Sequence, residues 1–158
     1  MRIKLKKLHD QVIVITGASS GIGLATAEMA AEAGARVVLS SRNEGDLRRA
    51  VERIRASRGR ASYFVADVAD DEAMEDLASH AVQEFGGIDT WVNNAGLGLY
   101  GRTMDVPLSD KRRLFDINFW GVVNGSLVAL PHLKSTKGAL INIGSEVSEA
   151  AIPLMGMY

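Results

Sequence analysis

The chain has 158 residues, of which 47% are apolar and 23% are charged, and its formal net charge is −1. This composition is typical of a folded domain, and the balance of charge excludes a strongly basic nucleic-acid-binding protein. The absence of cysteine from the sequence excludes disulfide bonds, thiolate catalysis and cysteine-ligated zinc. The histidines (His9, His80 and His132) lack the spacing of metal ligands, so we expect no metal site.

The opening segment is basic and carries Arg2, Lys4, Lys6 and Lys7. We interpret it as a solvated lead-in to the first strand, because a few charges without an aromatic anchor make a poor membrane contact. The sequence has no apolar run of the ~20 residues that a membrane helix needs, and no signal peptide precedes the first strand. We therefore expect a cytoplasmic protein that binds neither membrane nor nucleic acid.

The first part of the chain alternates strand patterns with helix patterns. Residues 11–16 (QVIVIT) and 36–41 (RVVLSS) are β-branched runs that predict strands, the first of them buried on both faces. A glycine-rich turn at 17–23 connects the first run to a helix that we expect to end at Gly34. We place the apolar side of this helix at Ile22, Ala25, Met29, Ala30 and Ala33.

A helix, a third strand and another helix follow. The first of these helices carries an apolar stripe at Leu47, Ala50, Val51 and Ile54. Residues 62–67 (SYFVAD) predict the third strand, and Asp70 or Asp71 then caps a helix that ends at Gly86-Gly87. The apolar stripe of that helix consists of Met74, Leu77, Ala78, Ala81, Val82 and Phe85.

The last elements are a fourth strand, a long helix and a fifth strand. Residues 88–93 (IDTWVN) predict the fourth strand, and the helix runs from near Ser109 to about Lys134, with a kink or frayed end near Pro131. Residues 138–145 (GALINIGS) predict the fifth strand, whose apolar residues on both faces favour an interior position. The alternative is a sheet edge, where a long apolar strand is a liability. The long helix has more apolar residues than one stripe can hold, which indicates that later residues or another subunit cover them.

A strand–turn–helix signature lies at Thr16-Gly17-Ala18-Ser19-Ser20-Gly21-Ile22-Gly23. Glycines let the backbone turn sharply and approach a pyrophosphate, and the unpaired amides of the helix start favour an anion. Ser19 and Ser20 add hydroxyl donors. The alternation of strands and helices around this turn predicts βαβ units in an α/β fold with a parallel sheet.

The end of the second strand predicts which dinucleotide binds. A carboxylate at that point favours NAD, because it accepts hydrogen bonds from the ribose hydroxyls. This sequence has Ser40-Ser41-Arg42 there, and Arg42 offers a paired, charge-assisted contact to a 2′-phosphate. We therefore predict NADP(H) as the cofactor. The alternative is that Arg42 is a solvated surface residue.

Further motifs follow in order: Asn93-Asn94-Ala95-Gly96 after the fourth strand, Asn118 in Asn118-Phe119-Trp120-Gly121, Ser145 at the end of the fifth strand, and Tyr158 thirteen residues later. With the glycine motif, this series resembles the short-chain dehydrogenase/reductase family, and the resemblance covers the chain from Gln11 onward. It implies a Rossmann-type doubly wound parallel sheet with strand order 3-2-1-4-5. We expect one dinucleotide-binding domain over residues 1–158, incomplete at its C-terminus.

The resemblance also implies a cofactor site. Asp67 would accept a hydrogen bond from the adenine amino group and Val68 would contribute its amide, although Asp67 could instead cap the following helix. Asn93 and Asn94 are expected to hold the sheet as well as the ligand, and Ser20 stands where the family has a second basic residue. The implied cofactor-binding residues are Gly17, Ser19, Ser20, Gly21, Ile22, Gly23, Arg42, Asp67, Val68, Asn94, Ala95 and Gly96.

The reaction that the resemblance implies is hydride transfer between nicotinamide and a carbonyl or alcohol carbon. Ser145 would polarise the substrate oxygen, Tyr158 would donate or remove the proton, and Asn118 would hold a water of the proton relay. The family's lysine, four residues after the tyrosine, falls beyond the end of this sequence. A free tyrosine has a pKa of about 10, so activity near neutrality requires roughly 4 kcal/mol of phenolate stabilisation, much of which that lysine supplies.

Three hypotheses follow. We favour an NADP(H)-dependent oxidoreductase whose sequence here is incomplete, acting on a small carbonyl or alcohol substrate that the sequence does not identify. The alternative is a non-catalytic NADP(H)-binding module. A methyltransferase is disfavoured, because such sites usually place a carboxylate where Ser41 and Arg42 stand. The family's assemblies favour a homo-oligomer through the long helix at 109–134, although packing within one chain explains the same apolar surplus.

Overall fold

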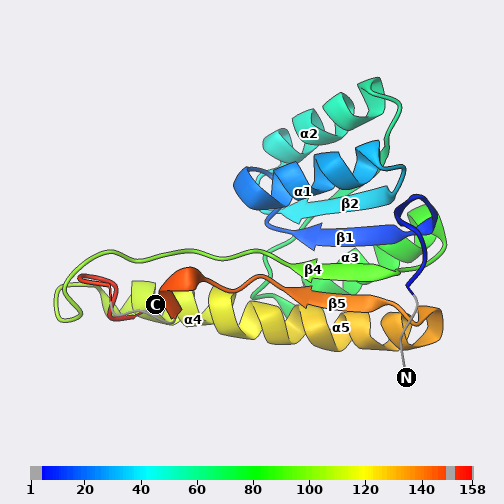
Figure 1. The fold of residues 1–158 in the computed structure, drawn as a ribbon. Coiled ribbons are helices and arrows are strands. Elements are labelled where there is room, and N and C mark those ends of the chain that lie inside the picture. The colour runs from blue at the N-terminus through cyan, green and yellow to red at the C-terminus, as the bar shows by residue number, and fades with distance from the viewer. Residues whose placement is uncertain (1–4, 149–151, 158) are drawn as a thin grey trace.

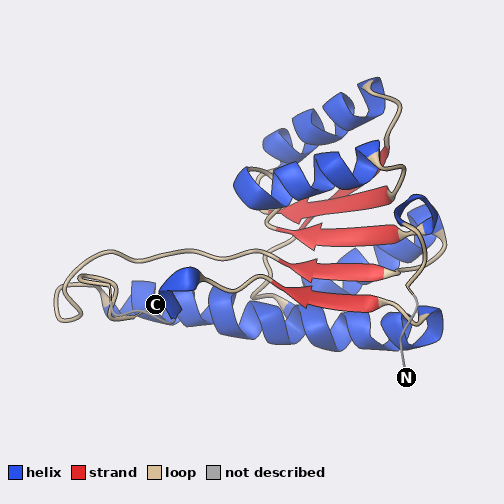
Figure 2. Cartoon of the chain, viewed as in Figure 1, coloured by secondary structure: helices blue, strands red, loops and turns tan. Residues whose placement is uncertain are grey.

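One parallel sheet with helices on both faces forms the molecule (Figures 1 and 2). The computed structural model describes residues 5–148 and 152–157. The strands are β1 (Val12–Thr16), β2 (Arg36–Ser41), β3 (Arg60–Val65), β4 (Thr90–Asn93) and β5 (Ala139–Asn142). Their order is β3-β2-β1-β4-β5 and every pairing is parallel, which confirms the predicted doubly wound fold.

The helices divide the buried apolar residues into two layers. Helices α1 (Gly21–Glu32) and α2 (Glu44–Ala56) cover one face of the sheet, and α3 (Asp71–Phe85) and α5 (Gly121–Thr136) cover the other. The short α4 (Leu108–Phe115) precedes α5. The predicted stripe of α2 is fully buried, and the stripe of α3 faces its core as predicted. No helix in the described segments is both long enough and apolar enough to cross a membrane.

All strands end at the same edge of the sheet. In Figure 1 the arrowheads point toward the side from which the segment after β4 extends and where α4 lies. The chain leaves β1 toward one face and β4 toward the other, so neighbouring strands diverge there. Ligands of open α/β sheets bind in the crevice at such a point.

The buried face of α1 differs from the predicted one. Ile22 and Met29 are exposed, at 68% and 70%, whereas Gly23, Ala27 and Ala31 face the sheet. Of the predicted stripe only Ala30 packs against the core, because the stripe was aligned on the larger side chains Ile22 and Met29. Small residues on the inner face let the helix approach the strands closely, which a stripe of larger residues would prevent.

The long helix is continuous but not uniform. A π-helical turn, Asp116–Trp120, joins α4 to α5, and the Gly121 amide donates to the carbonyl oxygen of Asp116. The helix neither ends nor frays at Pro131, because α5 continues to Thr136. π-helical turns within α-helices occur frequently at functional sites.

β2 has its predicted extent, β1 and β4 begin one and two residues later than predicted, and β3 and β5 differ more. β3 begins at Arg60 and ends at Val65, two residues earlier than predicted at each end. β5 is shorter than predicted and lies at the edge of the sheet, with Leu140 and Ile141 exposed at 37% and 42%. Of the two positions that the sequence left open for this strand, the structure has the edge one, since position within a sheet depends on partners and not on composition.

A second exposed apolar surface lies on α4, the π-helical turn and α5. It consists of Phe115, Phe119, Trp120, Leu127 and Leu130. The rings of Phe119 and Trp120 pack edge to face with their centroids 5.2 Å apart. The surplus of apolar residues that the sequence indicates on this helix is therefore present at the surface.

The basic opening segment includes one residue with a structural role. The Lys6 ammonium lies 2.6 Å from the carboxylate of Asp89, whose side chain is buried at 5% exposure. The other carboxylate oxygen of Asp89 accepts from the Val12 amide at 2.9 Å. Lys6 is exposed, as expected for a solvated segment, and in addition its ammonium neutralises a buried charge at the start of β1.

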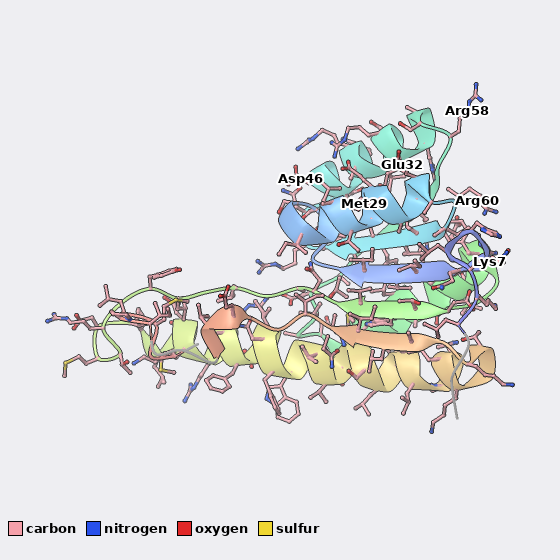
Figure 3. All side chains as sticks on the ribbon, in the orientation of Figure 1. Lys7, Met29, Glu32, Asp46, Arg58 and Arg60 are labelled. Atoms are coloured by element: carbon pink, nitrogen blue, oxygen red, sulfur yellow. The ribbon has the colours of Figure 1, made fainter. Side chains whose placement is uncertain are left out.

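Helix α2 ends with an arginine in a left-handed conformation. Arg58 has φ of 65°, and the next amide, of Gly59, donates to the Ile54 carbonyl oxygen at 2.9 Å, as in a Schellman motif. Figure 3 shows Arg58 beyond the end of α2, far from the carboxyl ends of the strands. Glycine is the residue that this position ordinarily takes, because it has no Cβ to clash.

We expect Arg58→Gly to raise the free energy of unfolding by about 1 kcal/mol, because it removes roughly 1–2 kcal/mol of left-handed strain at a smaller entropic cost. Denaturant unfolding measures this change. The control is Arg48→Gly in the middle of α2, which should lower stability by about 1 kcal/mol. A loss of stability in both variants would contradict the expectation.

A close contact between α5 and the sheet gives a second prediction. A Cβ on Gly125 would overlap Oδ1 of Asn93 and lie 2.9 Å from Nε1 of Trp91, both of which are buried. Gly125→Ala should lower the free energy of unfolding by about 1–3 kcal/mol, because the overlap outweighs the roughly 1 kcal/mol that alanine gains in a helix.

Thermal or denaturant unfolding tests Gly125→Ala against Gly87→Ala. A Cβ at Gly87 meets no atom within 4 Å, so that variant should be nearly neutral. Equal stability of Gly125→Ala and the unaltered chain would show that α5 is not held at this distance.

Candidate functional site

The ends of the two central strands are joined by one hydroxyl group. Thr16, the last residue of β1, is 1% exposed, and its Oγ1 donates to the Val92 carbonyl oxygen at 3.3 Å. The same oxygen accepts from the backbone amides of Asn94 and Ala95, each at 3.1 Å. The Asn94 side chain donates back to the carbonyl oxygens of Thr16 and Gly17 at 2.9 and 3.2 Å. The glycine motif and the Asn-Asn-Ala-Gly motif therefore form one connected unit.

Two of the motif glycines are required by the space around them. Gly17 has φ of 65°, and a Cβ on it would lie 2.8 Å from the Ala95 Cα. A Cβ on Gly23 would lie 2.5 Å from Nδ2 of Asn94. Any side chain at either position would push apart the turn and the segment after β4.

Helix α1 begins at Gly21, directly after the turn. Its N-cap residue, Ser20, makes no side-chain capping bond to any part of the chain that the structure describes. The first turn of the helix also lacks an acidic residue. Its amides and positive dipole end are therefore suited to an anion, and the hydroxyls of Ser19 and Ser20 lie beside them.

A first cavity of about 690 Å³ opens at this helix start. It extends from the β1–α1 turn past the ends of β2 and β3 to the segment after β4. Most of the predicted cofactor-binding residues line it. The lining residues are Gly17, Ser19, Ser20, Ser41, Arg42, Asn43, Glu44, Ala66, Asp67, Val68, Ala95, Gly96, Leu97 and Ile117.

Arg42 lies in the wall of the first cavity, and its side chain is exposed. Within residues 5–148 and 152–157 it forms no hydrogen bond or ion pair. The same wall includes Glu44, whose carboxylate accepts from the Tyr63 hydroxyl at 3.3 Å. The sequence prediction found no carboxylate at the end of β2 itself, and it missed this one because Glu44 belongs to the first turn of α2.

Asp67 lies in the loop after β3 and both of its carboxylate oxygens are engaged. Oδ1 accepts from the Ala69 amide at 3.1 Å, and Oδ2 accepts from Nη2 of Arg113 on α4. Asp67 does not cap the next helix, because Asp70 is the N-cap of α3 and accepts from the Ala73 amide. The capping alternative for Asp67 was therefore wrong.

A second cavity of about 550 Å³ adjoins the first. The two share Ala95, Gly96 and Leu97 in their walls. The second cavity includes the predicted catalytic residues Asn118 and Ser145. Its lining residues are Ile22, Asn94, Ala95, Gly96, Leu97, Gly98, Leu114, Phe115, Asn118, Phe119, Val122, Ile143, Gly144, Ser145 and Met157.

The Asn118 side chain, in the π-helical turn, holds the segment after β4. Its Oδ1 accepts from the Leu97 amide at 2.9 Å and its Nδ2 donates to the Leu97 carbonyl oxygen at 2.8 Å. Asn93 plays a similar part deeper in the sheet, where it is 3% exposed and contacts Trp91, Ser126 and Asn142. The sheet-holding role predicted for Asn93 and Asn94 is thus confirmed, since Asn93 binds Asn142 of β5 and Asn94 binds Thr16 of β1.

Ser145 follows β5 and is half-buried in the wall of the second cavity. Its Oγ accepts from the Val147 amide at 3.4 Å. Tyr158, the third predicted catalytic residue, lies outside the described residues. The structure therefore brings Asn118 and Ser145 to one cavity.

The remaining predicted residues lie close to these cavities. Ile22 and Asn94 line the second cavity but not the first. Gly21 and Gly23 form the first turn of α1, where Gly21 has φ of 55°. The described residues contain no group of three or more His, Asp or Glu side chains that could hold a metal ion.

Arg113 is a charged contact of the site that the sequence did not reveal. It belongs to a helix, and its partner Asp67 stands 46 positions earlier in the chain. Nothing in the local pattern distinguishes it from the neighbouring Arg112. Only the packing of α4 beside the loop after β3 brings the two charges together.

Comparison with known proteins relates the chain to one family of oxidoreductases. A family model for the short chain dehydrogenases matches residues 11–158. The chain is 46% identical over 159 aligned residues to the uncharacterised oxidoreductase YxnA of Bacillus subtilis, covering 99% of this chain and 45% of that protein. The chain thus spans about half the length of this relative.

Solved structures give the same family. An alcohol dehydrogenase of Thermococcus sibiricus, complexed with 5-hydroxy-NADP, superposes with a TM-score of 0.89 at 32% identity, over 94% of this chain and 63% of the other. A short chain dehydrogenase/reductase of Burkholderia phymatum in complex with NAD gives 0.93 at 33% identity, over 98% and 56%. The fold, the interlocked motifs and these matches together show that the chain belongs to the short chain dehydrogenase family.

Proposed function

We propose that this chain is the cofactor-binding part of an NADP(H)-dependent oxidoreductase that acts on a small carbonyl or alcohol substrate. The observation that carries the proposal is the pair of adjoining cavities. The first contains the phosphate-binding turn and Arg42, the second contains Asn118 and Ser145, and both share the backbone of residues 95–97. A bound dinucleotide would span both, with its reactive end beside the predicted catalytic groups.

The residues present fit such a cofactor. A Cβ on Gly17 or Gly23 would collide with Ala95 or Asn94, whereas a Cβ on Gly21 would meet no atom of the described residues within 4 Å, so the start of α1 is open to a diphosphate that its amides would bind. When bound, the nicotinamide supplies or accepts the hydride. The adenine end would lie near Asp67 and Val68, which also line the first cavity.

The choice of NADP(H) depends on Arg42. Its guanidinium is exposed in the cavity wall and can form a forked contact with a 2′-phosphate. Glu44 in the same wall opposes this preference by repelling a phosphate. We expect Arg42 to dominate, because it forms no internal contact with the described residues, whereas Glu44 accepts a hydrogen bond from Tyr63.

The chain's own residues would then position the substrate and move the proton. Ser145 lines the second cavity, where its hydroxyl would orient the substrate oxygen, and Tyr158 would exchange the proton with that oxygen. Because the amide of Asn118 already binds both backbone groups of Leu97, its first effect is to fix the shared wall of the two cavities. A relay water held at this π-helical turn is part of the same proposal.

The exposed apolar surface on α4, the π-helical turn and α5 indicates an interaction with further residues. We propose that the surface on α4 and α5, Phe115 to Leu130, is covered in the whole protein by residues of a longer chain or by a second copy. Support comes from the exposure of Trp120 and Leu127, at 54% and 66%, since large apolar side chains gathered on one face mark an interaction site.

Calorimetric titration with NADPH tests the proposed function. We expect one NADPH to bind per chain. In a version of the protein that spans the length of its relatives, Ser145→Ala should lower kcat for carbonyl reduction by roughly 100-fold or more and leave NADPH affinity unchanged. Binding without reduction of any carbonyl in a broad panel would support the non-catalytic module, and the absence of NADPH binding would contradict both.

Cofactor preference is tested separately with Arg42→Ala. Loss of a charged partner of the 2′-phosphate should weaken NADPH binding roughly 10- to 100-fold and leave NADH binding almost unchanged. The control is Arg48→Ala, an exposed arginine on α2 that does not line the first cavity. An equal effect of Arg42→Ala on both cofactors would contradict the NADP(H) preference.

A further inference from the structure

Side chains from two helices, α4 and α5, hold the loop after β3. Arg113 on α4 donates to the Asp67 carboxylate, and Nδ2 of Asn124 on α5 donates to the Val68 carbonyl oxygen at 3.1 Å. Val68 itself is 7% exposed. Asp67 and Val68, which line the first cavity, are therefore fixed by residues that do not belong to its described lining.

Arg113 differs from Asp67 in its access to the cavity. Asp67 lines it, whereas Arg113 is absent from the described lining residues. The two side chains are similarly half-buried, at 34% and 32% exposure. Any influence of Arg113 on a ligand in this cavity must therefore pass through the carboxylate that it contacts.

We propose that Arg113 is a positioning residue that sets the base specificity of the cofactor site by holding the Asp67 carboxylate in the orientation that accepts from an exocyclic amino group. The inference rests on the proposed function. With Oδ1 bound by the Ala69 amide and Oδ2 bound by Arg113, the carboxylate cannot rotate. Each oxygen retains a lone pair for one further donor.

This arrangement distinguishes purines by the group at C6. Adenine presents an amino donor there, which complements an ionised carboxylate, whereas hypoxanthine presents a carbonyl oxygen, which the carboxylate repels. Without Arg113 the carboxylate would be held only through Oδ1 and would lose its neutralising partner. It could then turn away from either base, and the difference between the two bases would shrink.

The test compares the affinities of NADPH and its hypoxanthine analogue by titration. The unaltered chain should prefer the adenine form roughly tenfold or more, the effect of one hydrogen bond to a charged group. Arg113→Gln should bring the two affinities within about twofold, mainly by weakening the adenine form. Arg112→Gln, the same change at the exposed neighbour, should leave the ratio as it was.

Asp67→Asn shows whether Arg113 acts through the carboxylate. This variant should also lose the preference, and adding Arg113→Gln to it should change the ratio no further. If Arg113→Gln weakened the binding of NADPH and of its hypoxanthine analogue equally, Arg113 would have only a structural role. If the variant bound NADPH more tightly, Arg113 would compete with the base for the Asp67 carboxylate. Either result would overturn the proposal while the proposed function stood. Failure of the unaltered chain to bind NADPH would remove both.

Discussion

The Thr16 hydroxyl is the contact on which the site depends. It is buried where β1 and β4 end side by side, and it uses its one donor and both lone pairs there, on the Val92 carbonyl and on the amides of Asn94 and Ala95. The two segments leaving these strands diverge, so without this bond nothing in the backbone ladder would fix their separation. The side-chain amide of Asn94 also donates to the carbonyl oxygens of Thr16 and Gly17 in the turn. The loops that form the cavity wall are thereby held in fixed positions relative to the ends of β1 and β4.

Small residues also fix the distance between the helices and these strand ends. Gly23 places the start of α1 against Asn94, and Gly125 places α5 against Asn93, each at a distance that excludes a Cβ. The adjacent asparagines of one motif thus contact helices on opposite faces of the sheet. Since the first turn of α1 and the π-helical turn before α5 border the two cavities, close packing in the core determines where the cavity walls stand.

The sequence predicted most accurately where a periodic pattern coincides with burial. The stripes of α2 and α3 follow from helical spacing and the extent of β2 from its β-branched run, and Asp70 was one of the two caps foreseen for α3. The inner face of α1 was missed because alanines lie on several sides of this helix, and the prediction chose the side that also contains Ile22 and Met29. The edge position of β5 and the Arg113 contact with Asp67 arise from tertiary packing, which a single sequence does not encode locally.

The two cavities differ in how they can recognise a ligand. Arg42, Glu44 and Asp67 line the first, whereas no charged residue is among the described residues that line the second. Charges recognise charged or strongly polar groups at a distance and tolerate solvent, which suits the phosphate and base ends of a dinucleotide. A reacting centre instead needs a few groups at fixed positions in apolar surroundings, where each hydrogen bond is stronger. The uncharged backbone of residues 95–97 separates these environments, and the two hydrogen bonds from Asn118 to Leu97 fix that backbone in place.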